Sequence, residues 1–299
     1  MRRAFSTTAL RKSKSRDQIA IWMEFTQLAL KYNAINLCHG TPGLSPPSYL
    51  TDNLAEATKE YQNNQYTMFL GHPLLREKIS EHFSPLLANG NRGQSLCPNS
   101  QILVTNGAIG SIFSAIMNLV GPGDSVHMFE PYYSQYVNHI EFSGAKLRTS
   151  PMYTDETGNW HFDFEHFERS LDQSTKLVLL TNPHNPSGKL WTKPEIERMT
   201  EILDRHPQVR LISDDVYFFL PFDGRKYESF ANFSPSNFAK TLTVYSAGKM
   251  LNCTGWKVGW MLGPKDLVAQ AMYVHEASTF NCNVPGQLAV AQSMDQAFG

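Results

Sequence analysis

From about residue 100 onward, short runs of apolar residues alternate with amphipathic segments of helical period. The run KLVLLTNP at 176–183 is apolar without interruption until its last residues, which is typical of a strand buried on both faces of a sheet. Thr192 and Glu195 then form the pattern of a capping box, which predicts the start of a helix. The apolar positions of that helix recur on one face: Ile196, Met199, Ile202 and Leu203.

The neighbouring segments continue this alternation of strand and helix. Strands are expected at 101–107, 125–131, 209–215 and 240–249, with 257–263 as a hairpin partner of the last. Helices are expected at 111–120 and 264–277. Such an order favours an α/β fold with a mainly parallel sheet and helices on both of its faces. Ligands of these sheets bind outside the carboxyl ends of the strands.

The composition is that of a globular protein. The chain has 299 residues, of which 41% are hydrophobic and 18% charged, so it is long enough for one large domain or two ordinary ones. Its formal net charge of −1 gives no general reason to expect a nucleic-acid or membrane partner. Nor does any apolar run reach the ~20 residues that a transmembrane helix needs.

The four cysteines are scattered, and no two of them form a CxxC pair: Cys38, Cys97, Cys253 and Cys282. This spacing argues against a zinc site and against a disulfide framework, so we expect no metal ion. A chain of this kind fits a reducing compartment.

The first residues, MRRAFSTTALRKSKSR, differ in composition from the rest of the chain. They are rich in basic residues, serine and threonine, and no acidic residue appears before Asp17. That composition is typical of a mitochondrial transit peptide at 1–16, with a disordered basic tail as the alternative. We expect mitochondrial localisation, with the cytoplasm as the alternative. After this segment we expect an N-terminal arm at 17–50 and one large domain at 51–299.

Two of the expected strands end in segments suited to an anion and to a planar ring. The small residues at 105–110 leave backbone N–H groups free for an anion at the start of a helix. Tyr132 follows the strand at 125–131 and offers a ring on which a planar ligand could stack. The alternatives are an ordinary strand-to-helix turn and an ordinary core aromatic.

Polar side chains follow the next two strands. The turn at 182–188 contains two prolines and a glycine, which hold its backbone rigidly, either to present a side chain or as a structural Asx turn. The candidate side chains are Asn182, His184 and Asn185. Asp214 and Asp215 end a buried strand, where a carboxylate needs a cation or a protonated ring nitrogen unless it caps a helix.

The segment SAGKMLNCTGWKVGW at 246–260 carries two lysines and no acidic residue. A lysine in an apolar site has a lowered pKa, and its amine then suits Schiff-base chemistry, for which Lys249 is the candidate. Lys257 could keep its charge and bind an anion together with Ser246. The alternative is a pair of surface lysines, which the neighbouring glycines and tryptophans disfavour.

One ligand accounts for these groups together. It has a planar ring, an anionic tail, a ring nitrogen that needs a carboxylate, and an aldehyde that reacts with an amine. Pyridoxal phosphate has each of these features, and its ring takes up electrons while a carboxylate keeps the nitrogen protonated. We therefore expect pyridoxal phosphate as the cofactor.

A series of motifs makes the chain resemble a known family: NQYTMFLGHPLLR (64–76), VTNGAIG (104–110), EPYYSQY (130–136), NPHNPSGK (182–189), SDDVY (213–217), SAGK (246–249) and GWKVGW (255–260). Over about residues 30–299 the chain is similar to the fold-type-I pyridoxal-phosphate aminotransferases of class I/II. Within them it most resembles kynurenine and glutamine transaminases and their cysteine-S-conjugate β-lyase relatives. The resemblance implies a mainly parallel sheet of seven strands between layers of helices.

Carried over residue by residue, the resemblance implies that Lys249 binds the cofactor covalently and moves the substrate proton. It implies that Asp214 pairs with the ring nitrogen, while Asn185 and Tyr217 bond the ring oxygen. The other implied cofactor contacts are Tyr132 for stacking and, for the phosphate, Gly107, Ala108, Ser246 and Lys257.

The resemblance further implies a homodimer with shared active sites. Tyr66 would reach the phosphate in the neighbouring subunit. Gly40, Asn185 and Phe280 would line the substrate pocket, with Phe280 contributed by its own or by the partner chain.

The implied activity moves the amino group of kynurenine, or of a related aromatic or neutral amino acid, to a 2-oxo acid. The alternatives are a cysteine-S-conjugate β-lyase with the same cofactor and a truncated cofactor-binding chain without catalysis. The family continues into a C-terminal small domain whose arginine binds the substrate carboxylate. This chain ends at Gly299 with no arginine after Arg225, so we expect that domain to be absent. Asp215 stands where those relatives more often carry glutamate.

Overall fold

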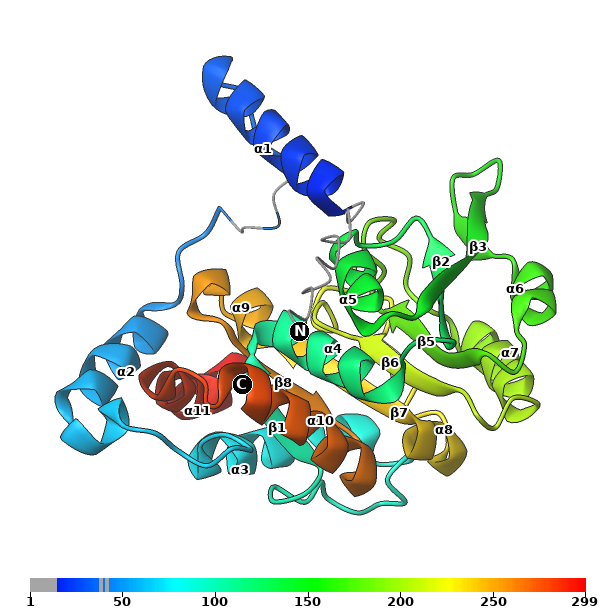
Figure 1. Cartoon of the computed structure of the whole chain (residues 1–299). Helices are drawn as coiled ribbons and strands as arrows, with labels where there is room; N and C mark the ends of the chain where they lie inside the picture. Colours follow the sequence, from blue (N-terminus) through cyan, green and yellow to red (C-terminus); the bar gives the residue numbers. More distant parts are fainter. Residues whose placement is uncertain (1–14, 38–39, 41–42) are drawn as a thin grey trace, which may run out of the picture.

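The computed structural model describes residues 15–37, 40 and 43–299, so residues 1–14 of the expected targeting segment lie outside the description (Figure 1). The described helices are α1 Ser15–Lys31, α2 Ser48–Lys59, α3 Pro73–Phe83, α4 Gly107–Leu119, α5 Gln135–Ser143, α6 Phe164–Ser170, α7 Lys193–Asp204, α8 Pro235–Lys240, α9 Ala247–Met250, α10 Lys265–Thr279 and α11 Val284–Phe298. The described strands are β1 Ile102–Asn106, β2 Ser125–Glu130, β3 Lys146–Thr154, β4 Trp160–Phe162, β5 Thr175–Thr181, β6 Arg210–Asp214, β7 Thr241–Ser246 and β8 Val258–Leu262.

These strands form one sheet in the order β1-β8-β7-β6-β5-β2-β3-β4. Only β8 and β4 run against their neighbours among the described strands, so the expected α/β fold with a mainly parallel sheet is confirmed. The hairpin of β7 and β8 is confirmed as well, with Tyr245 opposite Trp260. The sheet has one strand more than the seven expected, because the chain turns back after β3 and adds the short β4 along its edge.

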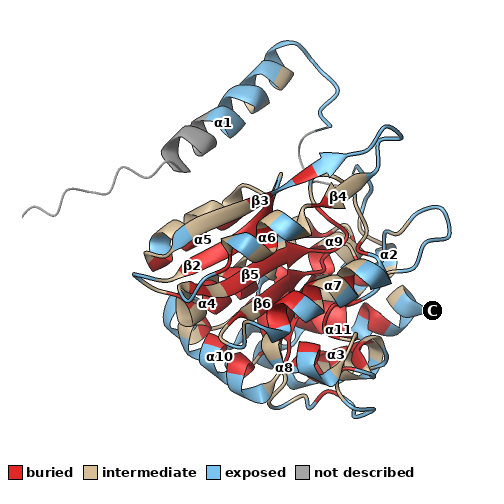
Figure 2. Ribbon diagram, turned by 90° about the vertical axis from the view of Figure 1, so that its right-hand side faces the viewer, coloured by how far each residue is buried: buried red, intermediate tan, exposed pale blue. Residues whose placement is uncertain are grey.

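Helices cover both faces of the sheet, and the core lies between the layers (Figures 1 and 2). On one face, side chains of α4, α5 and α10 pack with alternate residues of the strands, such as Leu177 and Leu179 of β5. On the other face, α6 and α7 pack with Val178 and Leu180. Helices α3 and α11 cover that same face beside β1 and β8. Alternation of side chains across a strand produces this division.

The apolar run at 176–183 behaves as its composition predicts. Leu177, Val178, Leu179 and Leu180 are all buried, two toward each helical layer. Burial of a side chain of this size contributes about 1.5–3 kcal/mol relative to its exposure. Strand β5 is therefore one of the elements that hold the two layers together.

Element boundaries follow the expected start signals, with two differences. The strand expected at 240–249 ends at Ser246, and Ala247–Met250 form the short helix α9. Glu195 accepts hydrogen bonds from the backbone N–H and the hydroxyl of Thr192, at 2.9 and 2.8 Å, and the predicted capping box opens α7. The helix expected at 111–120 begins earlier, at Gly107. Residues 107–110 thus form the first turn of α4 rather than a loop before it.

The N-terminal helix α1 stands away from the layered body in Figure 1. Many of its apolar side chains are exposed, as the pale blue helix in Figure 2 shows. None of the helices in the described part of the chain is long and apolar enough to cross a membrane.

Candidate active site

A cavity of about 850 Å³ opens where β1, β7, β6, β5 and β2 end. Parallel strands bring their carboxyl ends to one edge of a sheet, so the turns that follow them meet there. Most of the predicted site residues line this cavity: Gly40, Gly107, Ala108, Tyr132, Asn185, Asp214, Tyr217, Ser246, Lys249 and Lys257. Tyr66 and Phe280 do not.

Lys249 lies in the short helix α9, directly after β7. Its Nζ donates a hydrogen bond of 2.6 Å to the backbone oxygen of Gly40 and lies 5.7 Å from the ring centre of Tyr217. Burial lowers the pKa of this amine, the nearby Asp214 opposes that change, and the charge of Lys257 adds to it. A lysine with a lowered pKa has a larger neutral fraction, which is the form that acts as a nucleophile or a base.

Asp214 ends β6 and is only 6% exposed. The hydroxyl of Tyr136 donates a hydrogen bond of 2.6 Å to its Oδ2, whereas its Oδ1 has no hydrogen-bond partner in good geometry. Burial raises the pKa of this carboxyl to about 6, and the Tyr136 hydroxyl and the nearby backbone N–H of Val216 oppose the rise. An unpaired buried carboxylate oxygen is costly, so a site of this kind suits a ligand that brings an N–H donor.

The start of α4 and Lys257 form a cradle for an anion. Gly107 has a φ of +69°, and a Cβ on it would lie 3.2 Å from the Nζ of Lys257. Gly259 on β8 lets the backbone of Ala108 approach, since a Cβ there would lie 2.5 Å from the Ala108 nitrogen. Asn106 does not cap this helix with its side chain, so backbone N–H groups of its first turn stay available beside an ammonium.

Lys257 itself adopts a φ of +56°, in the left-handed region that residues other than glycine seldom occupy. Such conformations cluster at functional sites, where the surrounding structure holds them in place. Ser246, at the end of β7, lines the same cavity. These two side chains and the α4 turn form one polar end of the cavity.

Asn185 is the residue of the 182–188 turn that faces the cavity. Asn182 is used structurally, since its Nδ2 donates to the Glu228 oxygen at 2.8 Å and its Oδ1 accepts from the Trp191 N–H at 3.3 Å. His184 pairs through Nδ1 with the Ser187 hydroxyl at 2.7 Å. Of the three side chains left open by the sequence, Asn185 alone is therefore in the wall of the cavity.

Several further side chains of the cavity wall were not predicted: Trp22, Leu37, Tyr133, Tyr136, Thr181 and Val216. Tyr136 lies within the EPYYSQY motif together with Tyr132, so its membership of that motif was a usable signal. Trp22 comes from α1, far from the other residues in sequence, and no local pattern connects it with them.

Asp215 belongs to a different environment from Asp214. Its carboxylate accepts hydrogen bonds from the hydroxyls of Ser213 and Tyr227, the first at 2.6 Å, and it does not line the cavity. Burial raises the pKa of Asp215 to about 7, and the charge of Asp214 adds to the rise. Asp215, where the resemblance implies glutamate more often, thus lies outside the cavity wall.

Tyr66 and Phe280 lie together on the surface of the described chain. Their ring centres are 5.1 Å apart at an angle of 76°, and Phe69 stands 5.4 Å from Phe280 on the same patch. Tyr66 is 81% exposed and Phe280 46% exposed. Two residues that the resemblance places at an active site are therefore available at the surface.

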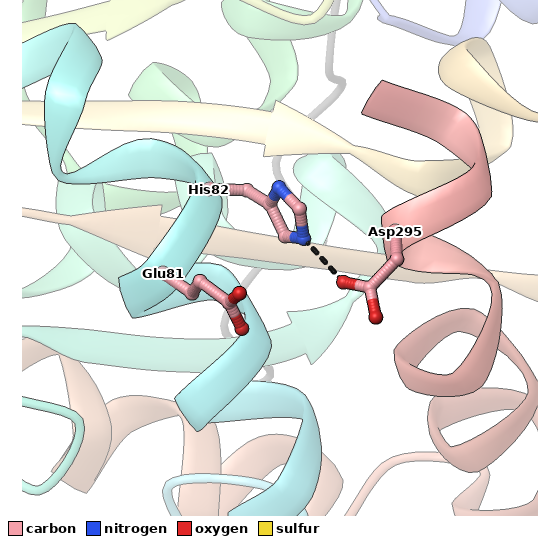
Figure 3. A group of neighbouring side chains, drawn as sticks. All are labelled: Glu81, His82 and Asp295. Carbon is pink, nitrogen blue, oxygen red and sulfur yellow. Dashed lines mark hydrogen bonds and ion pairs between the residues drawn. The ribbon is translucent and has the colours of Figure 1, made fainter. Parts of the chain in front are cut away.

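Outside the cavity, Glu81, His82 and Asp295 come close to one another between α3 and α11 (Figure 3). His82 Nε2 lies 2.7 Å from Asp295 Oδ1. The ammonium of Lys78 lies 2.8 Å from both Asp295 oxygens and 3.0 Å from Glu81 Oε2. A protein cation thus already balances these carboxylates, and we assign the group to an ion-pair link that ties α11 to α3.

The model of the family described as aminotransferase class I and II matches residues 32–298. The chain belongs to this family. Its members typically depend on pyridoxal phosphate. The sequence is 33% identical over 290 residues to a kynurenine–oxoglutarate transaminase of Dictyostelium discoideum, which covers 93% of this chain and 65% of the relative. It is 36% identical over 282 residues to kynurenine–oxoglutarate transaminase 3 of Mus musculus, which covers 91% of this chain and 60% of the relative.

Solved aminotransferase structures share the fold. YbdL from Escherichia coli, reported with a methionine aminotransferase function, superposes with a TM-score of 0.85 at 32% identity, covering 92% of this chain and 70% of that one. N-succinyldiaminopimelate aminotransferase from Mycobacterium tuberculosis gives a TM-score of 0.86 at 30% identity, covering 92% and 69%. The chain thus spans 60–65% of the length of the two curated relatives and about 70% of these structures.

Replacement of Asp214 by asparagine is expected to stabilise the protein without any ligand. Folding raises the pKa of this carboxyl from 3.8 to about 6, so the folded chain binds its proton more tightly and loses stability as pH rises through this interval. The substitution would remove that loss, while an amide oxygen still accepts from Tyr136. At about pH 8, we expect Asp214→Asn to gain about 2 kcal/mol in urea unfolding, and at about pH 4 almost nothing.

The control is Asp52→Asn, which removes an exposed carboxylate of α2 and should leave the free energy of unfolding nearly constant at both pH values. A loss of stability in Asp214→Asn at high pH would show that the carboxylate is better solvated than its surroundings suggest.

Proposed function

We propose that this protein is a pyridoxal-phosphate-dependent aminotransferase that moves the amino group of kynurenine, or of a related aromatic or neutral amino acid, to a 2-oxo acid. One observation carries the proposal above all. The cavity holds a lysine with a lowered pKa together with a buried carboxylate whose Oδ1 has no partner. That pair is what a pyridine aldehyde requires of a protein.

The cavity residues fit this cofactor. Asp214 Oδ1 is available to a protonated ring nitrogen, and Lys249 Nζ to an aldehyde. The start of α4, Ser246 and Lys257 offer N–H, hydroxyl and ammonium donors to a phosphate. Three more side chains in the wall would serve the ring, Tyr132 by stacking and Asn185 and Tyr217 by hydrogen bonds to its oxygen.

When bound, pyridoxal phosphate supplies an aldehyde and a ring that takes up electrons released at the substrate α-carbon. Lys249 is the amine that would hold the cofactor, and its free Nζ would take the substrate α-proton and later return it. Asp214 would stay ionised and keep the ring nitrogen protonated, since a positive charge beside a carboxylate lowers the pKa of that carboxylate.

Two observations support an aromatic or neutral substrate. The curated relatives are kynurenine–oxoglutarate transaminases, and a solved relative is reported with a methionine aminotransferase function. The cavity wall also carries the apolar surfaces of Trp22, Leu37 and Tyr133. A flat or extended apolar side chain would bury its surface there, while the backbone of Gly40 lies beside Lys249.

We further propose a homodimer whose two active sites share residues. Tyr66 and Phe280 contact each other on the surface and are outside the cavity wall of their own chain. In a homodimer they could serve the site of the partner chain, Tyr66 at the phosphate and Phe280 at the substrate. A symmetric dimer would also cover this exposed aromatic patch.

Mitochondrial targeting remains a proposal that rests on residues 1–16. Their basic, serine-rich and acid-free composition supports it. Residues 1–14 are not among those that the structure describes.

Lys249→Ala tests the activity. We expect the wild-type protein to give the visible absorption band of amine-bound pyridoxal phosphate. Borohydride reduction should then attach the cofactor permanently, as a label, to the peptide that contains Lys249. The variant should lose the band and lower amino transfer from kynurenine to a 2-oxo acid by about 10²–10⁴-fold. Lys265→Ala, at an exposed lysine of α10, is the control and should keep both.

Other results would lead to other functions. Pyruvate and ammonia released from a cysteine S-conjugate, without amino transfer, would identify a β-lyase. A band without turnover of either kind would identify a cofactor-binding chain, and a label on another lysine would overturn the role of Lys249.

Mixing two inactive variants tests the shared site. Tyr66→Ala and Lys249→Ala each lower activity in a pure dimer. In a mixed dimer with shared sites, one site combines the intact Lys249 of one subunit with the intact Tyr66 of the other, so activity should partly return. Co-expression of the two variants, with sedimentation to confirm dimers, measures this. Dimers that form without any return of activity would place Tyr66 at the site of its own chain or at neither.

Fusion of residues 1–16 to a fluorescent protein tests the targeting. We expect the fusion to enter mitochondria, because a basic segment without acidic residues is drawn by the membrane potential. The matched control replaces Arg2, Arg3 and Arg11 by glutamine, which should leave the fusion in the cytoplasm. Identical cytoplasmic distribution of both fusions would contradict the assignment.

A further inference from the structure

Tyr136 lies in the wall of the cavity, in the first turn of α5, and is only 1% exposed. Its hydroxyl donates to Asp214 Oδ2 at 2.6 Å and also lies 3.2 Å from the hydroxyl oxygen of Thr181. Because the Tyr136 proton is directed to the carboxylate, the Thr181 hydroxyl is the donor in the second bond. The two bonds form a short chain that runs from β5 through α5 to the end of β6.

These two hydrogen bonds determine which oxygen of Asp214 already has a donor. Oδ2 is bonded to Tyr136, whereas Oδ1 has no partner in good geometry. The neighbouring ring of Tyr133 packs edge-on against Tyr136, with ring centres 5.3 Å apart at 82°, and limits its movement. Thr181 lies opposite Asp214 in the parallel β5–β6 pair, so the backbone fixes their distance.

We propose that Tyr136 is a positioning residue, whose bond to Asp214 Oδ2 orients the carboxylate and keeps Oδ1 available to the ring nitrogen of the cofactor. This inference rests on the proposed function. In this role Tyr136 acts through Asp214, to which its hydroxyl is bonded. Without its hydroxyl, the carboxylate can rotate, and it loses a donor that stabilises its ionised form.

Asp215 offers a natural comparison within the same chain. Its carboxylate also accepts from a tyrosine hydroxyl, that of Tyr227, but it does not line the cavity. Removal of the Tyr227 hydroxyl therefore repeats the chemical change beside a buried aspartate that has no cofactor to serve. The pair Tyr136→Phe and Tyr227→Phe separates positioning of the ring nitrogen from general loss of a buried bond.

The test measures equilibrium binding of two cofactors, pyridoxal phosphate and its analogue with a carbon in place of the ring nitrogen. Wild-type protein should bind pyridoxal phosphate more tightly, since only this ring has a nitrogen for Asp214. Tyr136→Phe should lower the affinity for pyridoxal phosphate about tenfold and change the affinity for the analogue by less than about twofold. The ratio of the two affinities should stay at the wild-type value in Tyr227→Phe.

The pH profile gives a second measurement. Binding that needs ionised Asp214 weakens as pH falls through the pKa of this carboxyl, which burial has raised to about 6. Loss of the Tyr136 donor raises that pKa further, so the binding of pyridoxal phosphate to Tyr136→Phe should weaken at a higher pH than in wild type. Binding of the analogue should not show this shift. Should Tyr136→Phe not fold, Thr181→Val removes the donor behind the tyrosine and should change the ratio in the same direction, by about twofold.

The outcomes separate the inference from the proposed function. If Tyr136→Phe loses affinity for both cofactors equally, so that the ratio of the two affinities is unchanged, the positioning role is overturned and the proposed cofactor stays in place. A wild-type protein that binds the two cofactors equally, or binds neither, would overturn the use of Asp214 for a ring nitrogen, and this inference with it.

Discussion

The common direction of β1, β7, β6, β5 and β2 is the constraint on which the site depends. Parallel neighbours end at one edge of the sheet, so turns that are far apart in sequence meet there. Asp214 and Lys249 come from the ends of adjacent strands, and the anion cradle comes from the start of α4 on the far side of β8. The antiparallel β8 closes this arrangement because Gly259 lets the α4 turn approach its backbone. The two apolar layers therefore determine the relative positions of groups that make no contact with one another.

Two buried carboxyl groups at this edge of the sheet lower the stability of the fold when they are ionised. Asp214 and Asp215 are adjacent, both buried, and burial raises the pKa of each. Burial of carboxylates destabilises a fold unless they are paired, and the chain pairs them unequally. Asp215 accepts from two hydroxyls, whereas one oxygen of Asp214 has no partner. An unsatisfied polar group beside a cavity lowers stability but can serve function, because a ligand can supply the hydrogen-bond donor that the fold does not.

The chain also presents surface that its own fold does not cover. The patch of Tyr66, Phe69 and Phe280 is exposed, and so are many apolar side chains of α1. Trp22 from that helix nevertheless lines the cavity. The cavity wall thus comes partly from an outlying helix, and the aromatic patch lies exposed outside it. Association of two chains, as proposed above, would cover such a patch.

Local pattern by itself determined much of this protein. Continuous or alternating apolar runs predicted β5, β7 and β8, and the capping box predicted α7, because these elements depend on hydrophobic period and on bonds within a few residues. The same holds for the places of Asp214 at the end of β6, of Asn185 in the turn after β5 and of Lys249 in α9 directly after β7. Only the tertiary structure decided that β4 extends the sheet, that Trp22 reaches the cavity, and that Tyr136 takes one oxygen of Asp214 and leaves the other. Those facts depend on contacts between segments far apart in sequence, whose distances are set when the layers pack and not by the residues that flank them.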